Sequence, residues 1–388
     1  MKHKADREGR RARGDAPASS TPKWRAPLFA AALALCAYRA VEYHNYWNSL
    51  SPVVEVAQGP LQGRAARTDA GTEYFAFQGI PFAAPPVGPL RFRDPQPPAS
   101  WAPEVRDARA DGPICSQVAM PFPSALPSNV SVIDVVRFLG KIPALVHRVA
   151  KALRQSEDCL HLNVYTPKVG AAASLPVFVF IHGGAFVFGD NGLDVLGPQH
   201  IVERDVILVT VNYRLGALGF LAVGEAANGS LAKAPEGVGN AALKDVVAAL
   251  RWVRDNIAQF GGDPGRVTLG GQSAGGALAS YMTVVPAARG LFHRLVAMSG
   301  SMLHHLAFST PEQALARTRT LVRNLVRPEV AGGPDAPAAP DVADPADVLR
   351  YLREVDVHLL LDKDTFADME EVRRRLSPAP PVARAALT

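Results

Sequence analysis

The chain of 388 residues has little of what a membrane-spanning protein needs. Its N-terminal apolar run holds 13 apolar or small residues, between Arg25 and Arg39. A helix of that length spans roughly 20 Å, against roughly 30 Å for a bilayer core. A short apolar run behind a positive segment predicts a secretory signal peptide within a basic leader, residues 1–50. The alternative is an uncleaved anchor with an apolar part at 26–41, which would attach the protein to a membrane.

Beyond its first 25 residues the chain has no surplus of positive charge. Those residues hold eight lysines and arginines against three aspartates and glutamates, which accounts for the whole formal net charge of +5. The remainder is formally neutral, so it lacks the basic patch that nucleic acid binding requires. We therefore expect no nucleic acid partner. The sequence does not define an oligomeric state.

Cysteine is also scarce, with three residues in all. Cys36 lies in the leader, which leaves Cys115 and Cys159 as one pair. In an oxidising compartment this pair would form a disulfide, and the alternative is two unrelated buried thiols. Acceptor triplets for N-glycosylation begin at Asn129 and Asn228. These features and the leader favour the secretory pathway, with the protein secreted, or membrane-anchored with an extracellular or lumenal domain.

The composition, 48% hydrophobic and 20% charged, is that of a folded protein, and residues 51–388 are assigned to one domain. No repeat is evident. A strand-like alternation around a Gly-Pro turn at 53–66 predicts a hairpin. Apolar spacing at 241–260 predicts a crossover helix that ends at two glycines. Short apolar runs typical of strands buried on both faces occur at 175–184, 205–214, 266–273 and 293–300. The alternation predicts an α/β fold with a doubly wound, mostly parallel sheet.

Two other segments are rich in residues that break regular structure. Proline and glycine are dense at 77–101, which predicts an irregular surface segment. Residues 331–347 are low in complexity and predict a flexible loop. Helical spacing returns at 348–361.

The sequence GGQSAGG contains one G-x-S-x-G motif, at residues 271–275. In this motif a serine lies on a strained strand-to-helix turn, and the glycines allow the turn and a close approach of helix to strand. Ser273 is therefore the candidate nucleophile. A serine becomes reactive only with a base that takes its proton and an acid that orients the base.

The sequence HGGAF, residues 182–186, follows another predicted strand and is a candidate oxyanion loop. Backbone N–H groups of Gly184 and Ala185, with that of Ala274, are the expected donors to a developing oxyanion. An alanine in this loop still donates its N–H, provided its φ need not be positive. We expect His182 to orient the loop rather than to accept protons.

Five stretches in order resemble the type-B carboxylesterase and cholinesterase family: FQGIPFAAPPVGPLRF, SEDCLHLNVYTP, HGGAF, VNYRLGALGFL and FGGDPGRVTLGGQSAGG. The resemblance covers roughly residues 53–310. It implies an α/β-hydrolase fold that cleaves small-molecule carboxylic esters through an acyl-serine, with no cofactor and no metal. It assigns Ser273 as nucleophile, Gly184, Ala185 and Ala274 to the oxyanion hole, and Cys159 to a disulfide. In LFHRLVAMSG it makes His293 a scaffold residue.

The chain departs from the family at Gln272, where many members carry glutamate. Loss of that charge removes an attraction for cationic substrates. The loop between Cys115 and Cys159 also lacks the tryptophan with which cholinesterases bind choline. In combining this glutamine with an HGGAF-like loop, the chain is similar to juvenile hormone esterases and other arthropod esterases. Neutral, apolar esters are therefore the expected substrates.

The sequence lacks an evident base and acid for Ser273. After the serine, the histidines are His293, His304, His305 and His358, and no acid motif is visible among Asp356, Asp362 and Glu370. In the family these partners lie beyond the point that corresponds to the end of this chain. We therefore expect a truncated esterase whose C-terminal part is missing and whose 388 residues alone turn over almost no substrate. The alternatives are a non-catalytic, neuroligin-like adhesion module and a short isoform with an exposed sheet edge.

Overall fold

The computed structural model describes residues 49–118, 154–192, 197–227, 230–327 and 337–364, with helical positions at Ala34, Ala37, Tyr38 and Val41. Residues 1–48 and 49–388 form separate units. The glycosylation candidates Asn129 and Asn228 lie outside the described residues, as does most of the leader. Among the residues described, no helix combines the length and the apolar character needed to cross a membrane.

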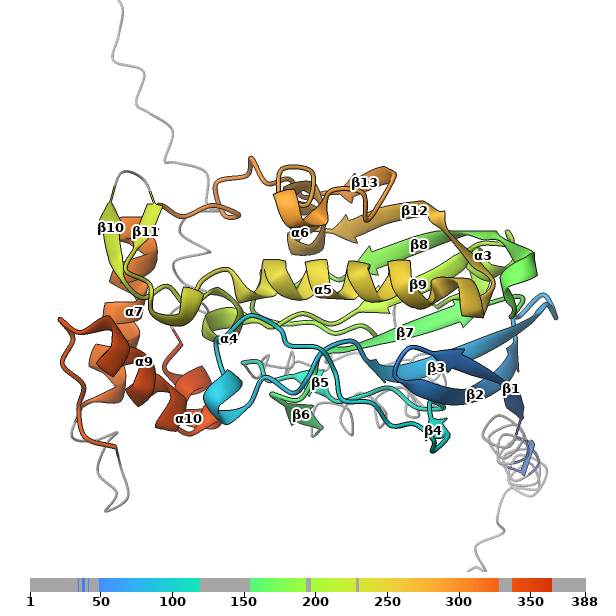
Figure 1. Cartoon of the computed structure of the whole chain (residues 1–388), viewed down its shortest axis with the longest axis horizontal. Coiled ribbons are helices and arrows are strands. Elements are labelled where there is room, and N and C mark those ends of the chain that lie inside the picture. The colour runs from blue at the N-terminus through green and yellow to red at the C-terminus, as the bar shows by residue number, and fades with distance from the viewer. Residues whose placement is uncertain are drawn as a thin grey trace, which may run out of the picture. The chain divides into compact units, whose positions relative to one another are not determined.

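A mixed sheet forms the centre of the second unit (Figure 1). Its strands follow the order β1-β2-β3-β7-β9-β8-β12-β13, and β4 pairs with β2. Their bounds are β1 Leu50–Val56, β2 Gly59–Arg67, β3 Glu73–Pro81, β4 Arg106–Asp107, β7 His161–Thr166, β8 Leu175–Ile181, β9 Ile207–Val211, β12 Gly262–Gln272 and β13 Arg294–Met298. Strands β9, β8, β12 and β13 are parallel, whereas β1, β2, β3, β7 and β9 pair antiparallel.

The sequence explains why β8 and β9 lie in the interior of the sheet. All five residues of β9 and four of the last five residues of β8 are buried, as expected for strands covered on both faces. The four predicted strands and the predicted hairpin, β1–β2, are confirmed. The predicted burial on both faces is wrong for β13, which ends the strand order and has four of its five residues exposed. The fold is the doubly wound, mostly parallel α/β arrangement that the sequence predicts.

Helix α5, Ala241–Asn256, confirms the predicted crossover helix and lies along the sheet (Figure 1). Its buried face includes Val246, Leu250 and Val253, spaced three and four residues apart. A 3-10 turn, Ile257–Phe260, continues it to Gly261, whose φ of 86° ends the helix. Shorter helices are α3 Gln199–Val202, α4 Gly216–Phe220 and α6 Ala274–Tyr281.

Three helices gather at one end of the sheet, where Figure 1 shows them beside a small hairpin. They are α7 Pro311–Leu325, α9 Pro345–Glu354 and α10 Val357–Asp362, and the hairpin consists of β10 Glu225–Ala227 and β11 Ser230–Ala232. Their apolar residues form a second core with α4. The helical spacing at 348–361 is therefore divided between two helices, which separate at Val355 and Asp356.

Two predictions about irregular segments are partly wrong. Residues 77–81 end strand β3, and Phe92 within the proline-rich segment is only 1% exposed, so this segment is not confined to the surface. Pro345 opens helix α9 inside the predicted loop, because the Asp344 side chain accepts a hydrogen bond from Ala346 N–H and caps the helix. The burial of Phe92 depends on neighbours distant in sequence, whereas the Asp344 cap is a local signal that composition alone does not show.

Candidate active site

Ser273 lies at the turn between β12 and α6, with φ 54° and ψ −121°. A non-glycine residue in this region costs about 1–3 kcal/mol, so surrounding contacts must hold it there. One is the hydrogen bond from Ser273 N–H to the carbonyl of Met298 at the end of β13, 2.8 Å long. The serine side chain makes no helix-capping hydrogen bond, so its hydroxyl is not used to stabilise α6.

The glycines of the motif are needed because backbone approaches backbone at this turn. A Cβ on Gly275 would lie 2.1 Å from the carbonyl oxygen of Ile181, the last residue of β8. A Cβ on Gly271 would lie 2.2 Å from the Gly275 carbonyl oxygen. Both separations are shorter than real carbon contacts, so larger residues would displace α6 from the sheet.

Residues 182–189, here called the oxyanion loop, follow β8 and lie against the serine turn. A Cβ on Gly183 would be 2.5 Å from Gln272 Oε1 and 3.2 Å from Ser273 Cβ. Ala185 has φ 51°, and Phe186 follows with φ 67°. From the sequence, alanine is expected to fit this position without a positive φ. That expectation is wrong, because the φ of Ala185 is positive. The loop holds Ala185 in a left-handed conformation, which adds strain beside Ser273.

Three backbone donors next to the serine are unused. In the described part of the chain, no hydrogen bond is made by the N–H groups of Gly184, Ala185 and Ala274. Ala274 is the first residue of helix α6. Its N–H is unused because the N–H groups of the first helical turn have no acceptor within the helix. Such donors can stabilise negative charge that develops on an oxygen beside Ser273.

His182 belongs to the frame of the loop. Its ring stacks on Tyr213 with centroids 4.4 Å apart, and its Nδ1 lies 2.7 Å from the Gly183 carbonyl oxygen. The Tyr213 hydroxyl donates to the His182 carbonyl at 3.1 Å. Burial raises the pKa of Tyr213, which keeps this phenol protonated as a donor.

The structure describes all four histidines that follow Ser273 in the sequence. His304 and His305 are exposed, with ring centroids 4.4 Å apart, and His293 Nδ1 accepts from the N–H of Val267. His358 is exposed in the first turn of α10. Among the described residues, none of these rings is hydrogen-bonded to Ser273.

The acidic candidates have other partners. Asp356 caps α10 by accepting from two of its N–H groups, and Asp362 forms an ion pair with Lys363. Glu370 lies outside the described residues. Within the described ranges, no three His, Cys, Asp or Glu side chains are close enough to hold a metal ion.

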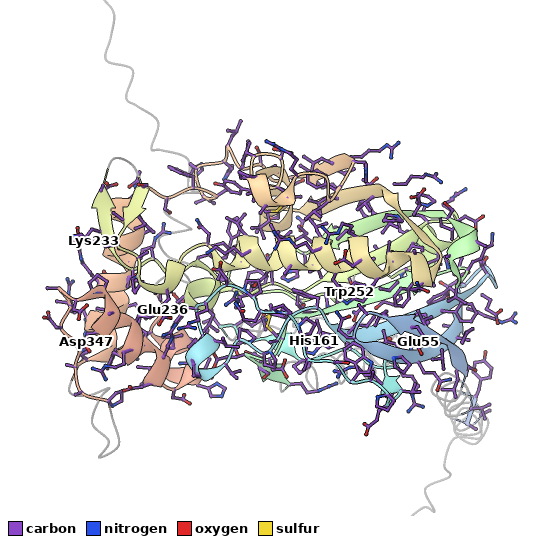
Figure 2. The ribbon with its side chains drawn as sticks, in the orientation of Figure 1. Glu55, His161, Lys233, Glu236, Trp252 and Asp347 are labelled. Atoms are coloured by element: carbon purple, nitrogen blue, oxygen red, sulfur yellow. A yellow bond between two sulfur atoms is a disulfide. The ribbon has the colours of Figure 1, made fainter. Side chains whose placement is uncertain are left out.

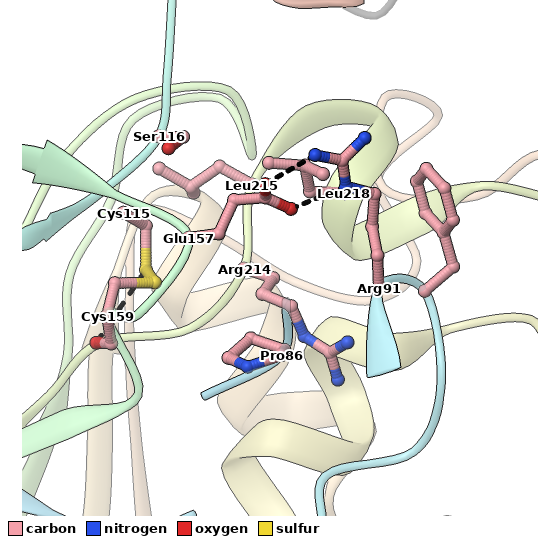
Figure 3. A pocket seen from close by; sticks show the side chains of 10 residues that line it. Pro86, Arg91, Cys115, Ser116, Glu157, Cys159, Arg214, Leu215 and Leu218 are labelled. Carbon is pink, nitrogen blue, oxygen red and sulfur yellow. Dashed lines mark hydrogen bonds and ion pairs between the residues drawn. A yellow bond between two sulfur atoms is a disulfide. The ribbon is translucent and has the colours of Figure 1, made fainter. Parts of the chain in front are cut away.

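Cys115 and Cys159 form a disulfide, the pairing expected from the sequence. It borders a small cavity that is also lined by Arg91, Glu157 and Arg214, and Figure 3 shows the ion pair of Arg91 with Glu157 there. Sequence reasoning missed this ion pair and the side chains that connect the disulfide to the oxyanion loop. Their partners are too far apart in sequence for a local pattern to reveal them.

The sheet order, the crossover helix and the serine at a strand-to-helix turn define the α/β-hydrolase fold. A family model described as the carboxylesterase family matches residues 50–387, and the chain therefore belongs to that family.

Similar proteins agree with this family. The chain is 41% identical to juvenile hormone esterase of Tribolium castaneum over 252 residues, which cover 65% of this chain and 37% of that protein. It is 39% identical to esterase B1 of Culex pipiens, covering 65% and 40%, and 38% identical to cocaine esterase of Oryctolagus cuniculus, covering 72% and 47%. The chain thus spans less than half the length of these curated relatives.

A solved structure is similar as well. The crystal structure of juvenile hormone esterase from Manduca sexta, with OTFP covalently attached, matches with a TM-score of 0.62 and 32% identity. The match covers 81% of this chain and 51% of that one. The likeness therefore extends from sequence motifs to the arrangement of strands and helices.

Proposed function

We propose that this protein is a serine ester hydrolase in which Ser273 is the nucleophile and Gly184, Ala185 and Ala274 form the oxyanion hole. The observation that carries the proposal is the strained serine beside three unused backbone donors. Membership of the carboxylesterase family supports it. The relatives named above are all esterases, so the non-catalytic alternative has no support among them.

In the proposed reaction the Ser273 hydroxyl attacks the ester carbonyl carbon and loses its proton to a base. The carbonyl oxygen becomes an oxyanion, which the three N–H groups stabilise. The carbonyl then re-forms, the alcohol leaves with a proton, and water hydrolyses the acyl-serine. The described residues place neither imidazole nor carboxylate in hydrogen-bond contact with Ser273. We propose that the base and its acid lie outside them.

We propose neutral, apolar esters as substrates, because the residue beside the nucleophile is uncharged. The exposed Gln272 lies next to Gly183, where a glutamate would place a negative charge at the edge of the site. A neutral amide provides no electrostatic attraction for a cationic alcohol group.

The setting of the protein is proposed on separate grounds. A disulfide persists in oxidising compartments, which supports a secretory location with a leader at 1–50 and the hydrolase domain at 51–388. Glycosylation at Asn129 and Asn228 and the absence of a cofactor remain parts of this proposal, and an uncleaved anchor at residues 26–41 remains the alternative to a signal peptide.

The test of the nucleophile is covalent labelling with a fluorophosphonate, followed by peptide mapping. We expect the label on Ser273, none on the Ser273→Ala variant, and full labelling of the control Ser301→Ala, which alters another half-buried serine. Labelling should be slow, because the described residues supply no base. A label on another serine in the wild-type chain would contradict the assignment.

The substrate class is tested with two phosphonates that differ only in a tert-butyl or a trimethylammonium group. The neutral compound should label Ser273 faster. Gln272→Glu should shift the ratio of rates toward the cationic compound by roughly fivefold, as a nearby partly screened charge predicts. An unchanged ratio would remove Gln272 as a determinant of substrate charge.

A further inference from the structure

A glutamine beside the disulfide, Gln117, is hydrogen-bonded to Gly189 at the far end of the oxyanion loop. Gln117 follows Cys115 by two residues and is half-buried. Its Nε2 donates to the Gly189 carbonyl oxygen at 3.0 Å, and its Oε1 accepts from the Gly189 N–H at 2.9 Å. One carboxamide therefore holds both backbone polar groups of a single loop residue.

The same glutamine is fixed to the segments that the disulfide joins. Its Nε2 also donates to the Cys115 carbonyl at 2.9 Å, and its backbone N–H donates to Gln155 Oε1 at 3.0 Å. Cys115 lies in β5, Ile114–Cys115, which pairs with β6, Gln155–Ser156. Both hydrogens of Nε2 are used. A half-turn of the amide would therefore place its oxygen against two carbonyls, and this chemistry fixes its orientation.

Gly189 in turn is packed onto the start of the loop. A Cβ there would lie 2.4 Å from His182 Nδ1 and 2.6 Å from the Gly183 carbonyl oxygen. Within the loop, the N–H of Phe188 donates to the Gly184 carbonyl at 3.0 Å. Because these groups are in close contact, a displacement of Gly189 is transmitted to the residues that carry the unused donors.

We propose that Gln117 is a positioning residue for the oxyanion hole, through which the Cys115–Cys159 disulfide fixes the Gly184 and Ala185 donors. The path runs from the disulfide and β5 through the Gln117 carboxamide to Gly189, and then across the closed loop. Figure 3 shows the Cys115–Cys159 disulfide from which this path starts. The proposal rests on the proposed function, since it assigns a role within that site.

The first test is Gln117→Met, which keeps the side chain's length and removes its donor and acceptor. Hydrogen exchange of a peptide covering residues 182–189 should become roughly tenfold faster, while exchange in α5 stays unchanged. Phosphonylation of Ser273 should slow roughly ten- to hundredfold, because small misplacements of oxyanion donors are costly. Gln117→Glu keeps the acceptor but places a carboxylate oxygen against the Gly189 and Cys115 carbonyls, so exchange should be at least as fast as in Gln117→Met. The control Gln96→Met alters an exposed glutamine whose side chain donates a hydrogen bond to the Asp94 carbonyl, two residues away.

The disulfide is tested with the double variant Cys115→Ser/Cys159→Ser, alone and combined with Gln117→Met. If both act through Gly189, the combined effect on residues 182–189 equals the larger single effect instead of the product of the two. The proposal is overturned if exchange at 182–189 is unchanged in folded Gln117→Met, or if exchange rises equally throughout the domain. A wild-type chain that takes no label would contradict the proposed function, whereas local exchange would still decide the role of Gln117.

Discussion

The serine turn and the contact of α9 with the segment at Arg91 and Arg93 differ in whether their polar groups have hydrogen-bond partners. At the turn, residues with positive φ lie beside N–H groups that have no hydrogen-bond partner among the described residues. At the other contact, here called the arginine anchor, the charged groups are paired: Arg91 with Glu157, and Arg93 and Arg353 with Glu236. Unused donors thus occur where we propose chemistry, and paired charges occur where the chain is held together. Positive φ values do not separate the two regions, because Phe92 and Glu236 of the anchor also have them.

The arginine anchor is built around one guanidinium. Arg91 donates to both carboxylate oxygens of Glu157, at 2.7 and 2.6 Å, and its remaining nitrogen reaches carbonyls at the end of α9, including that of Val355 at 2.6 Å. Both partners of the ion pair are about nine-tenths buried. A cation at a helix C-terminus is also favoured by the helix dipole. The pair therefore attaches the C-terminal helices to the region of the disulfide.

The largest expected effect comes from breaking this anchor. Arg91→Met leaves the buried Glu157 carboxylate and several carbonyls without their donor, and should lower the free energy of unfolding by about 3–5 kcal/mol. Urea unfolding measures it. The matched control is Arg67→Met, which removes an exposed arginine 3.9 Å from Glu73 and should cost about 0–1 kcal/mol. Equal losses in the two variants would contradict the role of burial.

At the serine turn we expect a substitution to raise the free energy of unfolding instead of lowering it. Ser273→Gly removes the Cβ at a positive φ and should raise the free energy of unfolding by about 1 kcal/mol, after allowance for the greater flexibility of the unfolded chain. The same variant should lose all covalent labelling. Ser301→Gly, at a residue without positive φ, should give no such gain. A destabilised Ser273→Gly would show that the turn carries no relievable strain.

The smallest expected effect is at the exposed edge of the anchor, where Figure 2 labels Glu236. Hydrogen bonds from Arg93 and then Arg353 lower the pKa of Glu236 to about 2, from an ordinary value of 4.5. This carboxylate therefore stabilises the folded state above about pH 4.5, and the contribution is lost as the pH falls toward 2.

Glu236→Gln should accordingly cost less than about 1 kcal/mol at pH 7, since the group is partly exposed. The difference from wild type should shrink between pH 4.5 and 2. Glu55→Gln, at an exposed position of β1 that Figure 2 also labels, serves as the control. A Glu236→Gln deficit that persists at pH 2 would show that the ion pair is not its cause.

Local sequence patterns predicted what depends on neighbours in the chain. The apolar runs of β8 and β9, the spacing of α5 and the turn at Ser273 each follow from a few consecutive residues. The hydrogen bonds between Gln117 and Gly189 join residues 72 positions apart in the sequence. The hydrogen bond from Arg91 to the Val355 carbonyl joins residues 264 positions apart. No local pattern encodes such pairs. The left-handed Ala185 was missed for a similar reason, because contacts of the whole loop impose its φ.

The most direct test of the central claim is a crystal structure of the protein after phosphonylation. We expect phosphorus bonded to Ser273 Oγ, with the phosphoryl oxygen about 2.7–3.1 Å from the N–H nitrogens of Gly184, Ala185 and Ala274. A phosphoryl oxygen directed away from these three groups, or an adduct on another serine, would contradict it.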